Sequence, residues 1–290
     1  MIDLTGVVGL GGDDGQVIPA AAVAGLMRGS GLRTVEALML ALLPQAQALA
    51  QPVISGFRVG AVGREWETGS LILGANVEFR GAPAADTIHA EQFLFSRAYH
   101  RGASLDLVAI SARPCGHCRQ FMAEFVGRER LRFLAPTGDQ LTLAEMLPWS
   151  FTPADLGAAG VTPAPGRALR VRDDGMVSAE LRAALGAAAG RAYTPYSRSP
   201  SAVVLQLDDG VIVSGAAIEN AAYNPGLPPL QTALINLIAA GHSYAAIRQA
   251  VIGSEAAGAV DHASSTRRLL ASLAPYARFD AVTWLAAAST

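Results

Sequence analysis

Both cysteines of this 290-residue chain lie in one short run, Pro114-Cys115-Gly116-His117-Cys118. A helix that begins after Pro114 would place the two sulfurs, three positions apart, on one face, where the dipole of its first turn favours thiolates. Upstream, the run His89-Ala90-Glu91 adds an imidazole. Two thiolates and one imidazole supply three ligands to a tetrahedral Zn²⁺, which then has an open fourth position. The chain must fold so that these three side chains meet.

Glu91 follows His89 by two positions, so the two side chains could not point the same way from the middle of a helix. In the first turn of a helix, one of them can bind the metal while the other lies over its open position. A carboxylate there can take a proton from metal-bound water and pass protons to a substrate as a nitrogen leaves. Glu91 is therefore the candidate proton carrier. His117 would point away from the sulfurs, which predicts a supporting or surface role.

The composition limits the classes of function. Hydrophobic residues make up 51% of the chain, charged residues 16%, and the net charge is −2, which argues against a disordered chain and against nucleic acid as a partner. No apolar stretch reaches the ~18–20 residues that a membrane span needs. The start, Met1-Ile2-Asp3-Leu4, lacks the basic segment of a secretory signal, and Asp13 and Asp14 follow. We therefore expect a cytoplasmic protein with a small-molecule partner and no membrane partner.

A Cys-x-x-Cys run in a reducing compartment indicates a metal site or a redox pair rather than a structural disulfide. The run alone favours neither of these two. Pro114 in front of it and the His-x-Glu run upstream favour the metal site.

The apolar pattern predicts helices and strands in alternation. Residues 17–50 indicate a small helical unit that Pro44 interrupts. After it come two strands joined by a hairpin, a helix with Thr87 as N-cap, a buried strand, and a helix that carries both cysteines. The expected ranges, in this order, are 57–63, 69–78, 87–100, 105–111 and 115–126. Strands that alternate with helices are typical of an α/β layered fold.

The chain then repeats itself after a Pro-, Gly- and Ala-rich segment, 148–174, which indicates a linker. Runs 52–55 and 74–78 line up with 195–197 and 215–219. His89 lies thirteen residues after Asn76, and Leu230 lies thirteen after Ala217. The second copy thus has Leu230-Gln231-Thr232 in place of His-Ala-Glu, and no cysteine, so it cannot build the same metal site. The predicted division is a helical N-terminal unit (1–50), a catalytic core (51–150), a linker (151–175) and a non-catalytic domain (176–290).

His-x-Glu followed by Pro-Cys-x-x-Cys is the signature of the zinc-dependent nucleobase deaminases. Beyond this signature, the chain resembles the long, two-core bacterial cytidine deaminases over nearly its whole length, in the runs 56–60, 74–79, 87–92, 114–122 and 193–234. The resemblance implies a three-layer α-β-α fold and a homodimer with one Zn²⁺ in each subunit. It also implies that the second core is a degenerate copy. The implied reaction is hydrolytic deamination of cytidine and deoxycytidine to uridine and deoxyuridine with release of ammonia, a step of pyrimidine salvage.

The resemblance also implies roles for individual residues. In the family's reaction zinc-bound hydroxide attacks C4 of the base, and Glu91 matches the residue that shuttles protons. The zinc ligands match His89, Cys115 and Cys118. The positions that match nucleoside contacts are Asn76 and Glu78 for the ribose 3′-hydroxyl, Phe57 beside the pyrimidine ring, Ala90 for a further substrate contact, and Phe151, which resembles an aromatic that reaches the neighbouring subunit's pocket.

Two alternative functions stay open. A deaminase that acts on cytosine or adenine in tRNA or single-stranded DNA would need a basic groove, which a net charge of −2 does not favour. A non-enzymatic module, in which zinc only stabilises the fold, would usually have four protein ligands, and only three are found here. Without the resemblance, Asn76 and Glu78 would be solvated residues at a strand end, and Phe57 a core aromatic.

Overall fold

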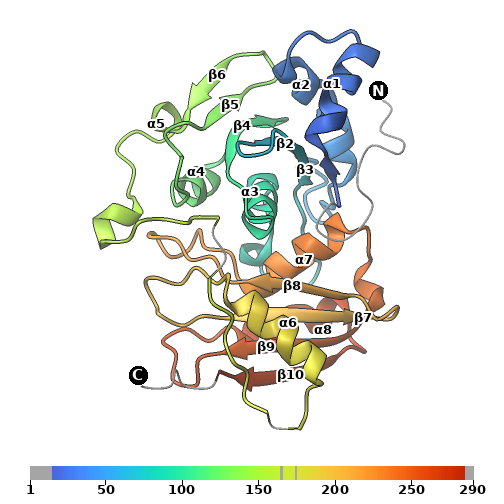
Figure 1. Cartoon of the computed structure of the whole chain (residues 1–290), viewed down its shortest axis with the longest axis vertical. Coiled ribbons are helices and arrows are strands. Elements are labelled where there is room, and N and C mark those ends of the chain that lie inside the picture. Colours follow the sequence, from blue (N-terminus) through green and yellow to red (C-terminus); the bar gives the residue numbers. More distant parts are fainter. Residues whose placement is uncertain (1–14, 164–165, 174, 285–290) are drawn as a thin grey trace. The chain divides into compact units, whose positions relative to one another are not determined.

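The computed structural model describes residues 15–163, 166–173 and 175–284, and Figure 1 shows their helices and strands. Residues 1–14, on which the expectation about a secretory signal rests, lie outside the described part, as do positions 164, 165 and 174 of the predicted linker. The chain forms two compact units, each built on one mixed β-sheet with helices. Of the described residues, the first unit contains 15–163 together with Asn220–Pro225 and Ala239–Gly241. The α/β class predicted from the sequence is confirmed.

The sheet of the first unit has the strand order β1-β3-β2-β4-β5-β6. Strand β2 is antiparallel to both β3 and β4, whereas β4 and β5 are parallel. All six residues of β4 are buried, as expected for a central strand covered on both faces. The strands are β1 (Val17–Ile18), β2 (Gly60–Glu65), β3 (Leu71–Ala75), β4 (Leu105–Ile110), β5 (Arg132–Leu134) and β6 (Gln140–Thr142).

Helices cover both faces of this sheet. On one face, α2 packs its buried side chains into a core cluster that includes Val62 of β2 and Leu73 of β3. On the other face lies α3, because a Cβ added at Gly63 or Gly74 would meet Leu94 of α3. Successive residues of a strand point to opposite faces, so glycines on one side let α3 approach closely. The helices are α1 (Ala20–Gly29), α2 (Val35–Ala48), α3 (Ala90–His100), α4 (Gly116–Met122) and α5 (Leu143–Met146), with 3₁₀ turns at Ala84–Asp86 and Pro153–Leu156.

Several predicted element ends are wrong. Helix α2 continues past Pro44 to Ala48, because Leu43 and Ala46 stay buried against the sheet and outweigh the one backbone hydrogen bond that proline removes. Helix α3 begins at Ala90, with His89 and not Thr87 as its N-cap. The preceding residue, Ile88, is bridged to Val77 and is therefore held in extended backbone. Helix α4 ends at Met122, four residues before the predicted end.

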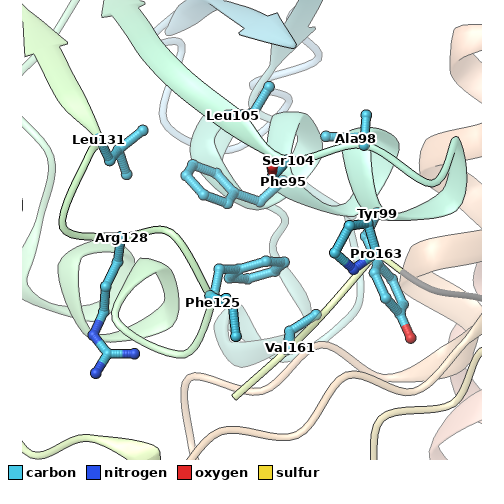
Figure 2. A pocket seen from close by; sticks show the side chains of 12 residues that line it. Phe95, Ala98, Tyr99, Ser104, Leu105, Phe125, Arg128, Leu131, Val161 and Pro163 are labelled. Carbon is cyan, nitrogen blue, oxygen red and sulfur yellow. The ribbon is translucent and has the colours of Figure 1, made fainter. Parts of the chain in front are cut away.

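The far end of α3 packs against a small apolar crevice that Figure 2 shows from close by. Its volume is about 10 Å³, which is close to the space of a single water molecule. The rings of Phe95 and Phe125 line it, with centroids 4.9 Å apart in an edge-to-face arrangement. Val161 and Pro163 close one side, and Val161 is held by backbone hydrogen bonds with Glu124 and Val126. The crevice is therefore core packing rather than a ligand site.

The second unit has a four-stranded sheet in the order β10-β9-β7-β8. Strand β7 is antiparallel to β8 and β9, and β9 is parallel to β10. This is the pairing of β3, β2, β4 and β5 in the first unit, and even the register shift near the end of β2 recurs at the end of β7. The elements are α6 (Ala179–Ala189), β7 (Ala202–Leu207), β8 (Ile212–Ala216), α7 (Pro229–Ala239), a 3₁₀ turn (Tyr244–Ala246), β9 (Ile247–Ser254), α8 (Ala263–Leu273) and β10 (Arg278–Thr283).

The strand pairing corrects the alignment of the two copies. The equal spacing of thirteen residues predicts that Leu230 is the equivalent of His89, and the β-bridges show otherwise. Val77 is bridged to Ile88, and the matching bridge joins Ile218 to Leu227. The equivalent of His89 is therefore Pro228, not Leu230, because the intervening segment is two residues shorter in the second copy. The conclusion that this copy lacks the metal ligands is unchanged, since Pro228-Pro229-Leu230 offers none. Among the described residues, no helix is both long and apolar enough to cross a membrane.

Candidate active site

The three predicted metal ligands meet at the starts of two helices. His89 is the N-cap of α3, Cys115 is the N-cap of α4, and Cys118 lies in the first turn of α4. His89 Nδ1 lies 3.6 Å from Cys115 Sγ and 3.2 Å from Cys118 Sγ, and the two sulfurs are 3.5 Å apart. Tetrahedral Zn²⁺ with ordinary bond lengths would set these separations at about 3.5–3.8 Å. Two of the three separations lie in this range and the separation between His89 Nδ1 and Cys118 Sγ is slightly shorter, so the donor set and its spacing fit zinc after a small outward shift of one side chain. No other such group of ligands is found in the described part of the chain.

The two sulfurs differ in environment. Cys118 is buried and Cys115 is exposed. The hydrogen bond between the two Sγ atoms lowers the pKa of Cys115 to about 4, whereas the same bond together with burial raises the pKa of Cys118. Without metal, the pair thus holds one proton between two sulfurs. A divalent cation that displaces this proton gains two thiolate ligands.

Glu91 lies in the first turn of α3, two residues after His89, and its side chain is only 3% exposed. Burial raises the pKa of Glu91, and this effect outweighs a hydrogen bond with Cys118 and the charge of His89, which both lower it. A carboxyl group whose pKa moves toward neutrality can accept a proton at one stage of a reaction and donate it at another. Of the acidic residues that line the cavity beside the ligands, Glu91 is the buried one.

These residues lie at a cavity of about 290 Å³ in the first unit, large enough for a small organic ligand. It brings together most of the residues predicted to contact substrate. The lining residues are Ser55, Phe57, Val59, Asn76, Glu78, Thr87, His89, Ala90, Glu91, Ile110, Ala112, Arg113 and Cys115. Phe151 is not among them.

Glu78 is held at the cavity by the segment before β2. Its Oε2 accepts the backbone N–H groups of Ile54 and Ser55 at 2.7 and 2.8 Å, and its Oε1 accepts the Ser55 hydroxyl at 2.5 Å. Desolvation raises the pKa of Glu78, but these hydrogen bonds outweigh it and leave the pKa below its ordinary value. The carboxylate is therefore ionised and fixed in direction, with acceptor capacity left for a ligand hydroxyl.

Asn76 lies just beyond the end of β3 and supports the neighbouring aromatic residue. Its Oδ1 accepts the Val59 N–H at 2.8 Å, and its Nδ2 donates to the Phe57 carbonyl at 3.0 Å. The second N–H of Nδ2 is the group that remains for a ligand. Phe57 itself is 61% exposed at the cavity, so it is not the core aromatic that its residue type alone would suggest.

Phe151 is a predicted site residue that does not line this cavity. The backbone carbonyl of Phe151 accepts the Gln120 side chain at 2.7 Å, and its proposed role in a neighbouring subunit stays a prediction. Ser55 and Arg113 line the cavity but were not predicted. A signal for Ser55 existed, since the aligned runs of both copies contain this serine, as Ser55 and Ser197.

A cavity in which a buried carboxylate lies beside three zinc-type ligands is the site of a metal-dependent hydrolytic enzyme. Two stretches of the chain, residues 33–134 and 143–267, match the sequence profile of the cytidine and deoxycytidylate deaminase zinc-binding region. Together they span well over half of the chain, which therefore belongs to the cytidine and deoxycytidylate deaminase family. The family's metal is zinc, and His89, Cys115 and Cys118 are arranged to hold it.

Two relatives of known name, each aligned over most of its length, agree with this membership. The chain is 40% identical over 254 residues to the cytidine deaminase of Vibrio atlanticus (strain LGP32), an alignment that covers 87% of this chain and 84% of that protein. It is 41% identical to the cytidine deaminase of Klebsiella pneumoniae subsp. pneumoniae, over 84% of this chain and 81% of that protein. The solved cytidine deaminase from Mycobacterium tuberculosis aligns with 41% of this chain and 98% of that one, at 26% identity and a TM-score of 0.37.

Proposed function

We propose that this protein catalyses the hydrolytic deamination of cytidine and deoxycytidine to uridine and deoxyuridine, with release of ammonia. The observation that carries the proposal is the position of Glu91, a buried carboxylate beside three zinc ligands, in the same cavity as the fixed carboxylate of Glu78. The names of the relatives, cytidine deaminases at 40–41% identity, support the same substrate. When bound, Zn²⁺ supplies Lewis-acid chemistry, which makes water a nucleophile at neutral pH.

Glu91 is the proton carrier in this proposal. Its raised pKa lets the carboxylate accept a proton as water is activated and then donate it to N3 of the pyrimidine ring. Glu91 then takes the remaining proton from the hydroxyl group that has been added to C4 and passes it to the 4-amino nitrogen, so that this group leaves as ammonia and C4 becomes a carbonyl. Ala90 begins α3, so its backbone N–H belongs to the first turn of the helix and is a donor that a substrate oxygen can use.

The sugar end of the nucleoside lies at Asn76 and Glu78 in this proposal. Glu78 accepts a hydrogen bond from the ribose 3′-hydroxyl, and the remaining N–H of Asn76 donates one to it. Both nucleosides carry this hydroxyl, so both are substrates. Phe57 contacts the face of the pyrimidine ring.

The wider organisation follows from the same family membership. We propose a cytoplasmic homodimer that acts in pyrimidine salvage, with Phe151 of each subunit at the partner's pocket. Residues 51–150 form the catalytic core in this proposal, behind a helical unit at 1–50. Residues 151–175 form the linker, and residues 176–290 form the degenerate second core.

Two variants test the proposal. Glu91→Gln removes the proton carrier but no zinc ligand, so we expect one Zn²⁺ to be retained and the kcat for cytidine to fall about 10²- to 10⁴-fold. Cys115→Ala removes a ligand and should lose both zinc and activity. Metal analysis and the ultraviolet absorbance change of cytidine measure the two effects. A Glu91→Gln protein with unchanged turnover would refute the mechanism, and turnover of a cytosine-containing oligonucleotide with inert cytidine would refute the substrate.

A further inference from the structure

The loop Asn220–Pro225, here named the 220s loop, belongs to the first unit although it lies in the later half of the sequence. It follows Glu219 directly, and three residues separate its last residue, Pro225, from the start of α7 at Pro229. Its residues form hydrogen bonds with α3 and with α4 and the residues just after it, and the zinc ligands lie at the starts of these two helices. No residue of the loop lines the cavity, so the loop acts on the site only through these helices.

Asn220 makes the closest of these connections. Its side chain is fully buried, its Nδ2 donates to the backbone carbonyl of Gln120 at 3.0 Å, and its Oδ1 accepts the Gln120 side chain at 3.4 Å. Gln120 lies in the last turn of α4, where carbonyl groups have no partner within the helix. It is also two residues after Cys118. Asn220 therefore supplies the missing donor at one end of a seven-residue helix whose other end carries both sulfurs.

A second connection follows one turn further on. The backbone N–H of Ala221 donates to Glu124 Oε2 at 2.8 Å, and Glu124 is fully buried. The loop is thus attached at two points, to α4 itself through Gln120 and to the segment after α4 through Glu124, and α4 has little freedom to slide or rotate.

The 220s loop also reaches the residues beside His89. Gln92 accepts the backbone N–H of His89 at 3.0 Å, and its Nε2 lies 3.5 Å from the Pro225 carbonyl. His117 lies between the two cysteines, with its Nε2 3.4 Å from the Asn224 carbonyl and its ring edge-to-face with His89 at 5.5 Å. One loop therefore contacts supports of all three ligands.

Asn220 also holds the loop in its shape. Its Oδ1 accepts the Ala222 N–H at 2.9 Å, and its backbone carbonyl accepts the Tyr223 N–H at 2.8 Å. Tyr223 has a φ of 62°, a left-handed conformation that is unfavourable for a non-glycine residue. These hydrogen bonds offset that cost, so the loop depends on Asn220 both for its conformation and for its attachment to α4.

We propose that Asn220 is a positioning residue of the zinc site. Through the 220s loop it fixes α4, and with it Cys115 and Cys118, at the distance from His89 that zinc requires. The inference rests on the proposed function only through the metal, because it concerns how tightly and in what geometry zinc is held rather than which nucleoside reacts.

The test is zinc retention in the full-length protein. Asn220→Ala should release zinc to a chromogenic chelator about 10- to 100-fold faster than the unchanged protein, the usual size of effect for a residue that supports a ligand. After replacement of zinc by Co²⁺, the absorption bands of the variant should shift or weaken, because they report on the tetrahedral thiolate geometry. Both measurements are made without substrate, so they stay valid if cytidine proves to be the wrong substrate.

Asn236→Ala is the matched control. Asn236 is also a buried asparagine, 5% exposed, whose Nδ2 donates to the Ser214 carbonyl at 2.8 Å within the second unit. We expect it to lose stability but to release zinc within about twofold of the unchanged protein. Equal acceleration by Asn220→Ala and Asn236→Ala would overturn the proposal, because zinc loss would then follow general stability. No acceleration by Asn220→Ala would overturn it as well.

Asn220→Asp keeps the proposal testable if the alanine variant does not fold. It preserves the shape and the acceptor of the side chain but replaces the donor to the Gln120 carbonyl with an oxygen. The expected result is again faster zinc release, with the loop conformation kept. Zinc release at the unchanged rate from a folded Asn220→Asp protein would show that the bond to α4 does not position the ligands.

Discussion

The cores of the two units share one topology and differ at the points where helices start. In each, a strand pairs with two antiparallel neighbours, and a helix follows the second strand of the hairpin. In the first unit, the N-cap positions of the two helices hold His89 and Cys115. In the second, Pro228 precedes α7 and His262 is the N-cap of α8. The same fold therefore carries a metal site only where three ligands occupy two helix starts.

The comparison also shows which part of a site survives when its reaction centre is absent. Glu219 accepts backbone N–H groups of Tyr196 and Ser197 at 3.0 and 3.2 Å, as Glu78 accepts those of Ile54 and Ser55. The carboxylate in this position thus holds the preceding loop in both units, whatever it binds. This structural role is present in both units, whereas the proposed substrate role of Glu78 depends on the zinc site beside it.

The largest effect that we predict concerns how closely a strand packs against the helix that follows it. Gly74 of β3 faces α3 in the first unit, and Gly215 of β8 faces α7 in the second. A Cβ at Gly215 would overlap the backbone nitrogen of Ala233, whereas a Cβ at Gly74 would meet only the ends of Leu94 and Phe93 side chains at 2.9 Å. Since backbone cannot move aside as a side chain can, Gly215→Ala should lower the free energy of unfolding by more than about 3 kcal/mol and Gly74→Ala by about 1–3 kcal/mol. Urea unfolding followed by circular dichroism measures both. A larger loss for Gly74→Ala would show that the helices are packed differently.

The next effect separates the two equivalent carboxylates. Glu78→Gln should lower kcat/KM for cytidine about 10- to 100-fold, mostly through KM, because it weakens one charge-assisted hydrogen bond to the sugar. Glu219→Gln should leave kcat/KM within about twofold, since that residue only holds its own loop. Steady-state kinetics with cytidine gives both values. Equal losses in the two variants would mean that Glu78, like Glu219, acts on structure alone.

The smallest effect that we predict is a pH dependence of stability that arises from one histidine of the second unit. Burial lowers the pKa of His262 and outweighs the charges of Glu219 and Asp261, which raise it. The unfolded chain then binds a proton at a higher pH than the folded chain, so stability is lost as the pH falls below about 6.5 and through the lowered pKa. His262→Gln should reduce this fall in Tm between pH 7.5 and 5.5 by about 1–2 °C. A parallel pH profile of Tm in the variant would contradict the assignment.

The sequence indicates which residues gather at this site, but it does not indicate the contacts that hold their helices in place. The zinc triad and Glu91 follow from local runs that carry their own chemistry, whereas Phe57, Asn76 and Glu78 are implied only by the resemblance to the deaminase family; the structure places these three at the same cavity as Glu91. The 220s loop follows the strand of the second copy in the sequence, whereas the structure joins it to α4 and the residues just after it. Nothing in a local pattern indicates that residue 220 lies beside residue 120.

The predicted ends of some helices and the predicted alignment of the two copies were wrong for a related reason. Counting residues made Leu230 the equivalent of His89, but a segment shortened by two residues makes it Pro228. Likewise Pro44 was predicted to interrupt a helix that runs through it, because burial of α2 against the sheet outweighs one lost hydrogen bond. Local preference is a weak force beside burial of a whole face.

The sequence by itself determined the ligand types, their spacing along the chain, the alternation of strands and helices, and the absence of ligands from the second copy. These are properties of short runs, in which side-chain chemistry and periodicity act within a few residues. Only the tertiary structure decided which distant segments meet: the 220s loop at α4, Ser55 at Glu78, and both cysteines at His89. Such contacts depend on the paths of several chain segments at once, and these paths are set by collective burial rather than by any one run of residues.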